Sequence, residues 1–168
     1  THLFLERREL DVPLKIVPNS PIIQEQLSHY YPEFIGKLTS PVVPGVMPGA
    51  LREARVVPID GGIIGFVGKE WKRKGLPFAV DIVKELRLTR PNLKFIVLGP
   101  NDTSDAKQLF AGWSGGYELM GWRNQARYTD FDVLLHPALA EPYGMVVTEA
   151  MGARVPVVIS DACGAKAQ

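Results

Sequence analysis

The sequence has a single cysteine and lacks any long hydrophobic run. Because Cys163 is the only cysteine among 168 residues, an internal disulfide is impossible, and a reducing compartment is expected. No apolar stretch approaches the roughly 18 residues needed to cross a bilayer, and the chain does not start with a signal-peptide pattern. We therefore expect a cytoplasmic protein, or one that works at the inner face of the membrane.

An excess of charge is also absent. Lys and Arg number 19 against 18 Asp and Glu, so the net charge of +1 gives no global signal for binding nucleic acid. Histidine, cysteine and acidic residues have no metal-ligand spacing. The glycines lack the spacing of a dinucleotide fingerprint or a Walker loop. With 46% hydrophobic residues, the composition predicts an ordinary globular domain with a sizeable core and no metal site.

Short apolar runs alternate with helical patterns after residue 50. This alternation favours an α/β fold with a parallel doubly wound sheet of the Rossmann-like type. The predicted strands are 62–68, 93–98, 117–120, 131–137 and 155–159. The predicted helices are about 76–86, 106–113 (with Thr103 or Ser104 as the cap), a short one over 123–128, and 145–151.

Residues 1–50 have a different pattern and too few elements for an independent core. Ser20 is predicted to cap a helix that begins at Pro21. The other expected elements are a helical turn or tail over 1–12, short strands over 14–17 and 37–43, and then a linker rich in proline and glycine. The sequence starts without methionine, so we expect either a processed protein or an excised fragment, with residues 1–50 as the end of another domain.

In a doubly wound sheet, ligands bind beyond the carboxyl ends of the strands. This rule brings five segments to one edge: 68–75, 99–103, 121–123, 136–144 and 160–164. The first segment carries four cations, which are Lys69, Lys72, Arg73 and Lys74. Such a cluster is either a solvated loop or a phosphate-binding loop, because Lys and Arg make charge-assisted bonds to phosphate.

A strand-to-helix junction at 141–151 is the second candidate site. Gly144 at the mouth of the helix lets a backbone approach a ligand closely, and the first amides of the helix suit an anion such as a diphosphate. Glu149 lies on this helix among apolar residues, where a carboxylate is costly unless hydroxyl groups hydrogen-bond to it. A pair of sugar hydroxyls fits that need, although a solvated helix face is the alternative.

Other residues of the predicted edge carry weaker signals. His136 ends a strand there and is expected to be structural. Tyr143 is equally suited to loop packing and to ligand contact. The three tryptophans, Trp71, Trp113 and Trp122, are expected to pack rather than to stack on a ligand.

These motifs together resemble a known family. Glu141-Pro142-Tyr143-Gly144, Glu149-Ala150-Met151 and Val155-Pro156-Val157-Val158 resemble the donor-domain signature of retaining GT-B glycosyltransferases, above all the bacterial lipopolysaccharide core and exopolysaccharide transferases. Gly68-Lys69 with Lys74-Gly75 resembles that family's Gly-Arg…Lys-Gly loop. The similarity runs through nearly the whole chain from Leu14.

The resemblance implies a role for each motif. Lys69 and Lys74 would hold the donor diphosphate and stabilise it as the leaving group, next to the backbone of Gly68. Glu149 would bind the ribose hydroxyls of the nucleotide, and Glu141 would face the transferred sugar. Further contacts would come from the amides of Gly144, Met145 and Val146, and from Tyr143.

The resemblance also implies substrates and a domain division. The donor would be a UDP- or GDP-sugar and the acceptor a saccharide or a lipid-linked saccharide, with no metal or other cofactor. Residues 51–168 would be the donor-binding domain, incomplete at its C-terminus. Residues 1–50 would be the end of an otherwise missing acceptor domain with the linker, so the chain would bind donor but transfer poorly.

The sequence departs from the family pattern in four places. Lys69 replaces the usual arginine and loses its bidentate fork. The segment from Gly121 to Asp132 is short, which bears on the nucleobase pocket, and Gly164-Ala165 and Gln168 stand where other residues are usual. The alternatives are a GT-B nucleotide-sugar epimerase, a phosphorylase-like enzyme, or a non-catalytic Rossmann-like interaction domain.

Overall fold

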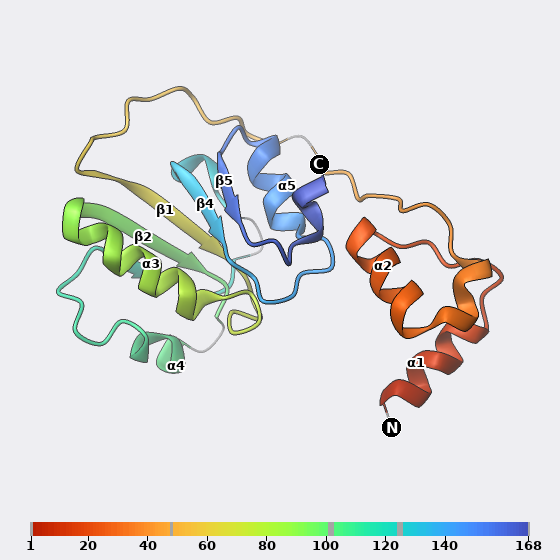
Figure 1. The fold of residues 1–168 in the computed structure, drawn as a ribbon. Coiled ribbons are helices and arrows are strands. Elements are labelled where there is room, and N and C mark those ends of the chain that lie inside the picture. Colours follow the sequence, from red (N-terminus) through yellow and green to blue (C-terminus); the bar gives the residue numbers. More distant parts are fainter. Residues whose placement is uncertain (1, 48, 101–102, 124–125, 168) are drawn as a thin grey trace.

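The protein is built on a parallel five-stranded sheet, seen in a computed structural model that describes residues 2–47, 49–100, 103–123 and 126–167 (Figure 1). Every neighbouring pair of strands is parallel, in the order β3-β2-β1-β4-β5. This confirms the predicted doubly wound α/β fold. The strands are β1 (Gly61–Val67), β2 (Asn92–Leu98), β3 (Tyr117–Leu119), β4 (Val133–His136) and β5 (Val157–Ile159).

Helices cover both faces of the sheet. The helices α3 (Leu76–Thr89) and α4 (Thr103–Gln108) share one apolar cluster with alternate residues of β1 and β2, whereas α5 (Met145–Gly152) belongs to a cluster on the other face. Close packing of this second face requires Gly65, because a Cβ there would lie 2.2 Å from the ring of Phe131. The two clusters make a three-layer domain with the sheet in the middle.

The strand order reverses between β1 and β4. The chain runs outward from β1 through β2 to β3, and then crosses back to form β4 and β5 on the other side of β1. The loops after β1 and β4 therefore leave the sheet in opposite directions. Such a switch point opens a crevice at the carboxyl ends of the two strands.

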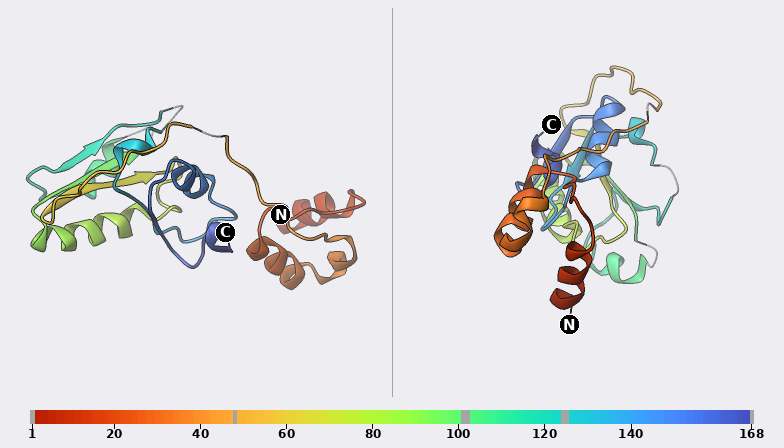
Figure 2. Two further views of the ribbon diagram at one scale, coloured as in Figure 1. Left: turned by 90° about the horizontal axis from the view of Figure 1, so that it is seen from above. Right: turned by 90° about the vertical axis from the view of Figure 1, so that its right-hand side faces the viewer.

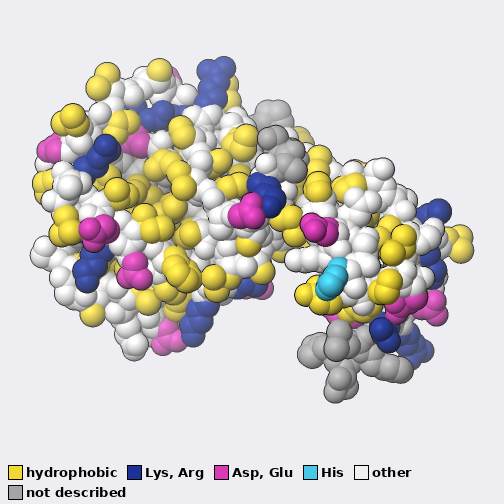
Figure 3. Space-filling view, viewed as in Figure 1, with side chains coloured by type: hydrophobic (Ala, Val, Ile, Leu, Met, Phe, Trp, Pro, Cys, Tyr) yellow, Lys and Arg dark blue, Asp and Glu magenta, His cyan; other side chains and the backbone are white. Residues whose placement is uncertain are grey.

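The N-terminal part forms a smaller lobe of helices beside the sheet domain (Figures 2 and 3). Its helices are α1 (His2–Asp11), α2 (Pro21–Tyr30) and the 3-10 helix η1 (Pro32–Lys37). The predicted cap is confirmed, since the Ser20 side chain accepts a hydrogen bond from the Ile23 amide at 3.3 Å. The predicted strands 14–17 and 37–43 are wrong: only Ile16 and Leu38 pair, in one isolated bridge.

Two predicted helices also differ from the structure. The helix over 106–113 begins earlier and ends at Gln108, so Thr103 and Ser104 lie inside it rather than capping it. Phe110 lies beyond its end and stacks on Tyr117 with ring centroids 4.3 Å apart. The expected helix over 123–128 is replaced by the 3-10 helix η2 (Tyr128–Asp130), with residues 124–125 outside the described part.

The linker, which is the segment 39–60 between η1 and β1, is attached to the sheet domain by Asp132. Its carboxylate lies 2.6 Å from Arg52 Nη2 and 2.8 Å from Arg55 Nε, and it accepts a hydrogen bond from the Ile63 amide at 2.8 Å. Burial opposes ionisation, but these three donors lower the pKa of Asp132 below its ordinary value. The carboxylate therefore fixes the path of the linker along the amino ends of the strands.

The small lobe also touches the loop that follows β4. The Ser20 hydroxyl donates to the Pro142 carbonyl, and Gly164 in the 3-10 helix η3 (Gly164–Ala167) approaches the same carbonyl. A Cβ at Gly164 would lie 2.1 Å from the Pro142 oxygen, so a larger residue does not fit. Among the described helices, none is both long enough and apolar enough to cross a membrane.

Candidate active site

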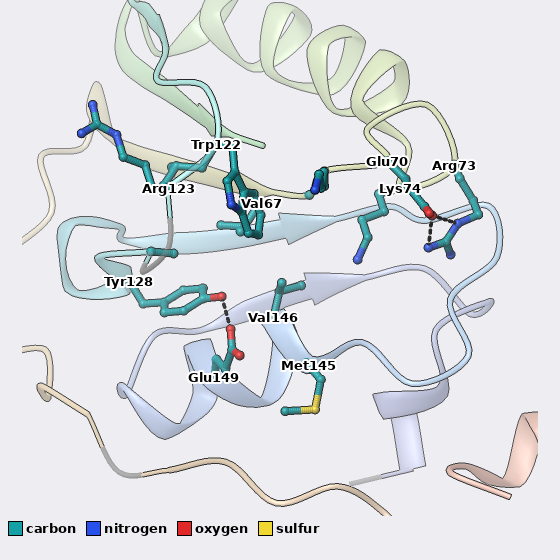
Figure 4. Close-up of a pocket in the computed structure, with 14 residues that line it drawn as sticks. Val67, Glu70, Arg73, Lys74, Trp122, Arg123, Tyr128, Met145, Val146 and Glu149 are labelled. Atoms are coloured by element: carbon teal, nitrogen blue, oxygen red, sulfur yellow. Dashed lines mark hydrogen bonds and ion pairs between the residues drawn. The ribbon is translucent and has the colours of Figure 1, made fainter. Parts of the chain in front are cut away.

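A cavity of about 430 Å³ opens at the switch point between β1 and β4 (Figure 4). Its walls come from the cationic loop after β1, the segment after β3, and the first turns of α5. The lining residues are Val67, Gly68, Lys69, Glu70, Arg73, Lys74, Leu98, Trp122, Arg123, Ala126, Tyr128, Met145, Val146 and Glu149. The cationic loop and the Glu149 helix, predicted to share one edge, therefore line a single cavity.

The cationic loop is fixed against the loop after β4. Gly75 has a left-handed conformation with φ of 81°, and a Cβ there would lie 1.9 Å from the Pro137 carbonyl oxygen. The Leu139 amide donates to the Arg73 carbonyl at 2.9 Å, and the Arg73 guanidinium donates to the Ala140 carbonyl. These contacts hold the loop as one rigid unit with the chain that leads to Glu141.

Lys74 lies at the junction of the two loops and forms a buried ion pair. Its Nζ is 2.9 Å from Glu141 Oε2, and His136 Nε2 is 3.5 Å from the same oxygen. Glu141 is only 9% exposed and His136 is completely buried. Burial alone raises the pKa of Glu141, but His136 and the Lys74 ammonium together lower it to about 2. The carboxylate is therefore a permanent anion that holds the lysine in place.

The other cations of the loop have different surroundings. The Lys74 stem passes over Gly68, where a Cβ would lie 2.5 Å from its Cδ. Lys69 and Trp122 both line the cavity, and Lys69 Nζ lies 5.6 Å from the centroid of the Trp122 ring. Lys72 is outside the cavity and lies over the Trp71 ring at 5.1 Å. Of the four predicted cations, Lys69, Arg73 and Lys74 line the cavity and Lys72 does not.

The first turn of α5 forms the opposite wall. Gly144 precedes the helix with φ of 100°, a conformation that favours glycine, and a Cβ there would meet Cys163 Sγ at 2.8 Å. Met145 and Val146 follow and line the cavity. The first amides of a helix have no partner within it and lie at its positive end. This wall is therefore suited to an anion held between α5 and Lys74.

Glu149 projects from the second turn of α5 into the same cavity. Its Oε2 accepts a hydrogen bond from the Tyr128 hydroxyl (Figure 4). Burial raises the pKa of Tyr128 above its ordinary value, and the bond to Glu149 raises it further. The phenol thus stays protonated and donates, and among the described residues no other side chain donates to Glu149, so its second oxygen is an acceptor for a further donor.

Three predicted site residues, Glu141, Tyr143 and Gly144, are not among those that line this cavity, and Gly144 only precedes the helix whose first residues do. The Glu141 carboxylate is turned toward Lys74 and His136, behind the lysine, instead of lining the cavity. The Tyr143 side chain is 3% exposed, and its hydroxyl donates to the Pro44 carbonyl at 3.0 Å. Tyr143 therefore joins the linker to the loop, whereas Glu141 supports Lys74.

The sequence assigned no ligand contact to two aromatic residues of the cavity wall, Trp122 and Tyr128. Trp122, expected to pack, is 49% exposed and faces the cavity. The rule that ligands bind after strand ends had already placed 121–123 at this edge, so that signal was present. Tyr128 had no comparable signal, because nothing in the spacing relates it to Glu149, 21 residues later. Among the described residues, no cluster of three or more His, Cys, Asp or Glu is arranged for a metal.

The sequence was compared with the sequences of known protein families. The family described as "Glycosyl transferases group 1" matches residues 61–168, from the first strand through the cavity to the end of the chain. The chain belongs to this glycosyltransferase family. The matched residues include both cavity loops, α5 and Glu149.

Individual relatives agree with this assignment. The chain is 31% identical over 125 residues to a protein called uncharacterized glycosyltransferase MJ1607 from Methanocaldococcus jannaschii, covering 67% of this chain and 30% of that protein. Two solved structures share the fold at 20% identity. WaaG, a glycosyltransferase involved in lipopolysaccharide biosynthesis, has a TM-score of 0.73, with 91% of this chain and 46% of that one covered. Sucrose-phosphate synthase from Thermosynechococcus elongatus has a TM-score of 0.74, with 98% and 45% covered.

The chain is shorter than these proteins. It spans about 30% of the length of the curated relatives that it matches, and under half of the two solved chains. The similarity therefore concerns one region of a GT-B glycosyltransferase, and in the two solved structures that region corresponds to 91% and 98% of this chain, so it includes the sheet and most of the small lobe.

Proposed function

We propose that this chain binds the nucleoside diphosphate part of an activated sugar, as the donor-binding region of a retaining glycosyltransferase. One observation carries the proposal: the cavity at the switch point is lined at once by Lys69, Lys74, the start of α5 and Glu149. Cations and helix amides suit a diphosphate. A carboxylate such as Glu149, with a second oxygen as acceptor beside the one that Tyr128 holds, suits a pair of ribose hydroxyls.

The proposed chemistry is stabilisation of the leaving group. When the bond between the sugar and the diphosphate breaks, negative charge grows on the phosphate oxygen that departs. Lys74 and the amides of Met145 and Val146 would stabilise that charge, at a few kcal/mol for each well-placed donor. The ion pair with Glu141 keeps the lysine ammonium at this position before the donor arrives. In this proposal lysine and amide groups, rather than a metal, supply the positive charge.

The proposal extends to the domains and the acceptor. Residues 51–168 would be the donor domain, and residues 1–50 the end of the acceptor domain with its linker. The contact between Ser20 and the Pro142 carbonyl supports this division, because it lies where a small lobe meets the loop of Glu141. The acceptor would be a saccharide or lipid-linked saccharide, as the likeness to WaaG suggests. A direct contact between Glu141 and the transferred sugar stays a prediction.

Calorimetric titration of the chain with UDP and with GDP tests the proposal. We expect one of them to bind in the micromolar to low-millimolar range, with equal affinity in the presence of EDTA. Lys72→Met is the matched control, because Lys72 belongs to the same loop but lies outside the cavity. Absence of binding to both nucleotides at millimolar concentration, in folded protein, contradicts the proposal.

A further inference from the structure

Tyr128 is a polar residue of the cavity to which the proposed chemistry assigns no role. Its ring is half-buried, and its hydroxyl donates to Glu149 Oε2. A tyrosine hydroxyl has one proton to donate, and here that proton is committed to the carboxylate. The contact joins η2, just before β4, to the second turn of α5. The 3-10 helix η2 and the helix α5 thus meet at Glu149, the carboxylate that α5 contributes to the cavity.

The position of the Tyr128 ring is set by packing beneath it. The ring meets Phe131 edge to face, with centroids 6.2 Å apart and planes at 90°. Phe131 is 1% exposed and lies over Gly65 of β1, which has no side chain to displace it. A chain of contacts therefore runs from the central strand through two aromatic rings to the hydroxyl, which leaves that oxygen little freedom to move.

Tyr128 and Glu149 also line a second cavity, and Ala126 and Met145 are shared by the two cavities as well. This second cavity, of about 660 Å³, is lined by both residues and, on its other side, by linker residues such as Gly45 and Ala50. Loss of the whole Tyr128 side chain would change the shape of both cavities. Removal of the hydroxyl alone keeps the wall and takes away only the hydrogen bond, so the two roles can be tested separately.

We propose that Tyr128 is a positioning residue that orients the Glu149 carboxylate toward the ribose of the bound nucleotide. The inference rests on the proposed function, since it needs a nucleotide in the cavity. With Oε2 held by the phenol, the remaining oxygen and lone pairs of Glu149 face the cavity as acceptors for a vicinal diol. Without the phenol, the carboxylate rotates freely and loses side-chain entropy when the ribose binds.

The test compares Tyr128→Phe with the unchanged chain in two titrations. The first uses UDP or GDP, whichever binds, and the second uses its 2′,3′-dideoxy analogue, which lacks the diol. We expect the variant to bind the ribonucleotide about 5- to 10-fold more weakly, the usual cost of ordering one freed side chain on binding. Binding of the dideoxy analogue should change less than about 2-fold. Tyr117→Phe, a tyrosine of β3 outside the cavity, is the control.

Each other outcome has a distinct meaning. Equal losses for both nucleotides would show a purely structural role, and unchanged affinity for both would show that the hydroxyl has no role; either result overturns the inference. If the unchanged chain binds both forms equally, the ribose assignment of Glu149 fails and the inference with it, while diphosphate binding stands. If it binds neither, the proposed function fails as well.

Discussion

Substitution of Lys74 by methionine separates the two roles of this lysine. The side chain lines the cavity and also neutralises Glu141, with 2.9 Å between Nζ and Oε2. Methionine has a similar length and no charge, so Lys74→Met keeps most of the packing and removes the ammonium. The variant should therefore lose stability through Glu141 and lose nucleotide affinity through the cavity.

The structure sets the size of both effects. The Lys74 and Glu141 side chains are 16% and 9% exposed, and breaking a buried pair costs about 3–5 kcal/mol when one charge is left alone. His136 at 3.5 Å and Arg73 at 3.8 Å remain near Glu141, so about 2–3 kcal/mol is expected. For a chain of this length, that lowers the melting temperature by roughly 4–12 °C. Loss of one charged contact to phosphate should weaken nucleotide binding about 10- to 100-fold.

A double variant tests the reasoning. In Lys74→Met with Glu141→Gln, the unpaired carboxylate is gone, so thermal denaturation should show most of the lost stability restored. Calorimetry should show that nucleotide affinity stays low, because the cavity still lacks its ammonium. Lys72→Met is expected to change neither quantity. A double variant as unstable as the single one, or a single variant with full affinity, would refute the assignment of the two roles.

Three further predictions follow from the same structure. Because the pKa of Glu141 is lowered from 4.5 to about 2, its stabilising effect is complete above pH 4.5 and is lost as the pH falls toward 2. Between these pH values, the free energy of unfolding of Glu141→Gln should therefore fall by about 2–3 kcal/mol less than that of the unchanged chain. Gly68→Ala should displace the Lys74 stem, weaken nucleotide binding by calorimetry about 10-fold and lower the melting temperature by no more than Lys74→Met does, whereas Gly36→Ala, with open space around it, should change neither. Asp132→Ala should release the linker, lower stability by about 2–3 kcal/mol and speed its proteolysis between residues 51 and 60.

The sequence predicts the sheet domain well because its strands are short runs that glycine or proline bounds and helical patterns separate. The central strand Gly61–Val67 is apolar and mostly buried throughout, whereas Asn92–Leu98 is exposed at Asn92 and Lys94 and buried toward its end. The alternation with helices then implies parallel pairing. The same reasoning fails for residues 14–17 and 37–43. The first segment is mostly apolar and the second mixes polar and apolar residues, but in the described structure no sheet lies beside either, and Leu14 is 91% exposed.

The candidate site was predictable to the extent that local chain geometry determines it. Gly144 before a helix and lysines after a strand are local signals, and the strand-end rule brings them together. The directions of Glu141 and Tyr143 depend instead on long-range partners: Lys74 for the carboxylate and Pro44 for the phenol. No spacing along the sequence encodes such partners, so only the folded chain shows them.

The hydroxyl of Ser20 serves two neighbours at once. It accepts from the Ile23 amide in the first turn of α2, and it donates to the carbonyl of Pro142, next to Glu141. The small lobe therefore supports the loop whose carboxylate holds Lys74. A protein shortened to the sheet alone would expose that carbonyl and the tightly packed Gly164 to water. The loop that carries Glu141 would then lose the hydrogen bond from Ser20 that helps to hold it. The boundary between the lobes is thus a poor place to cut this molecule.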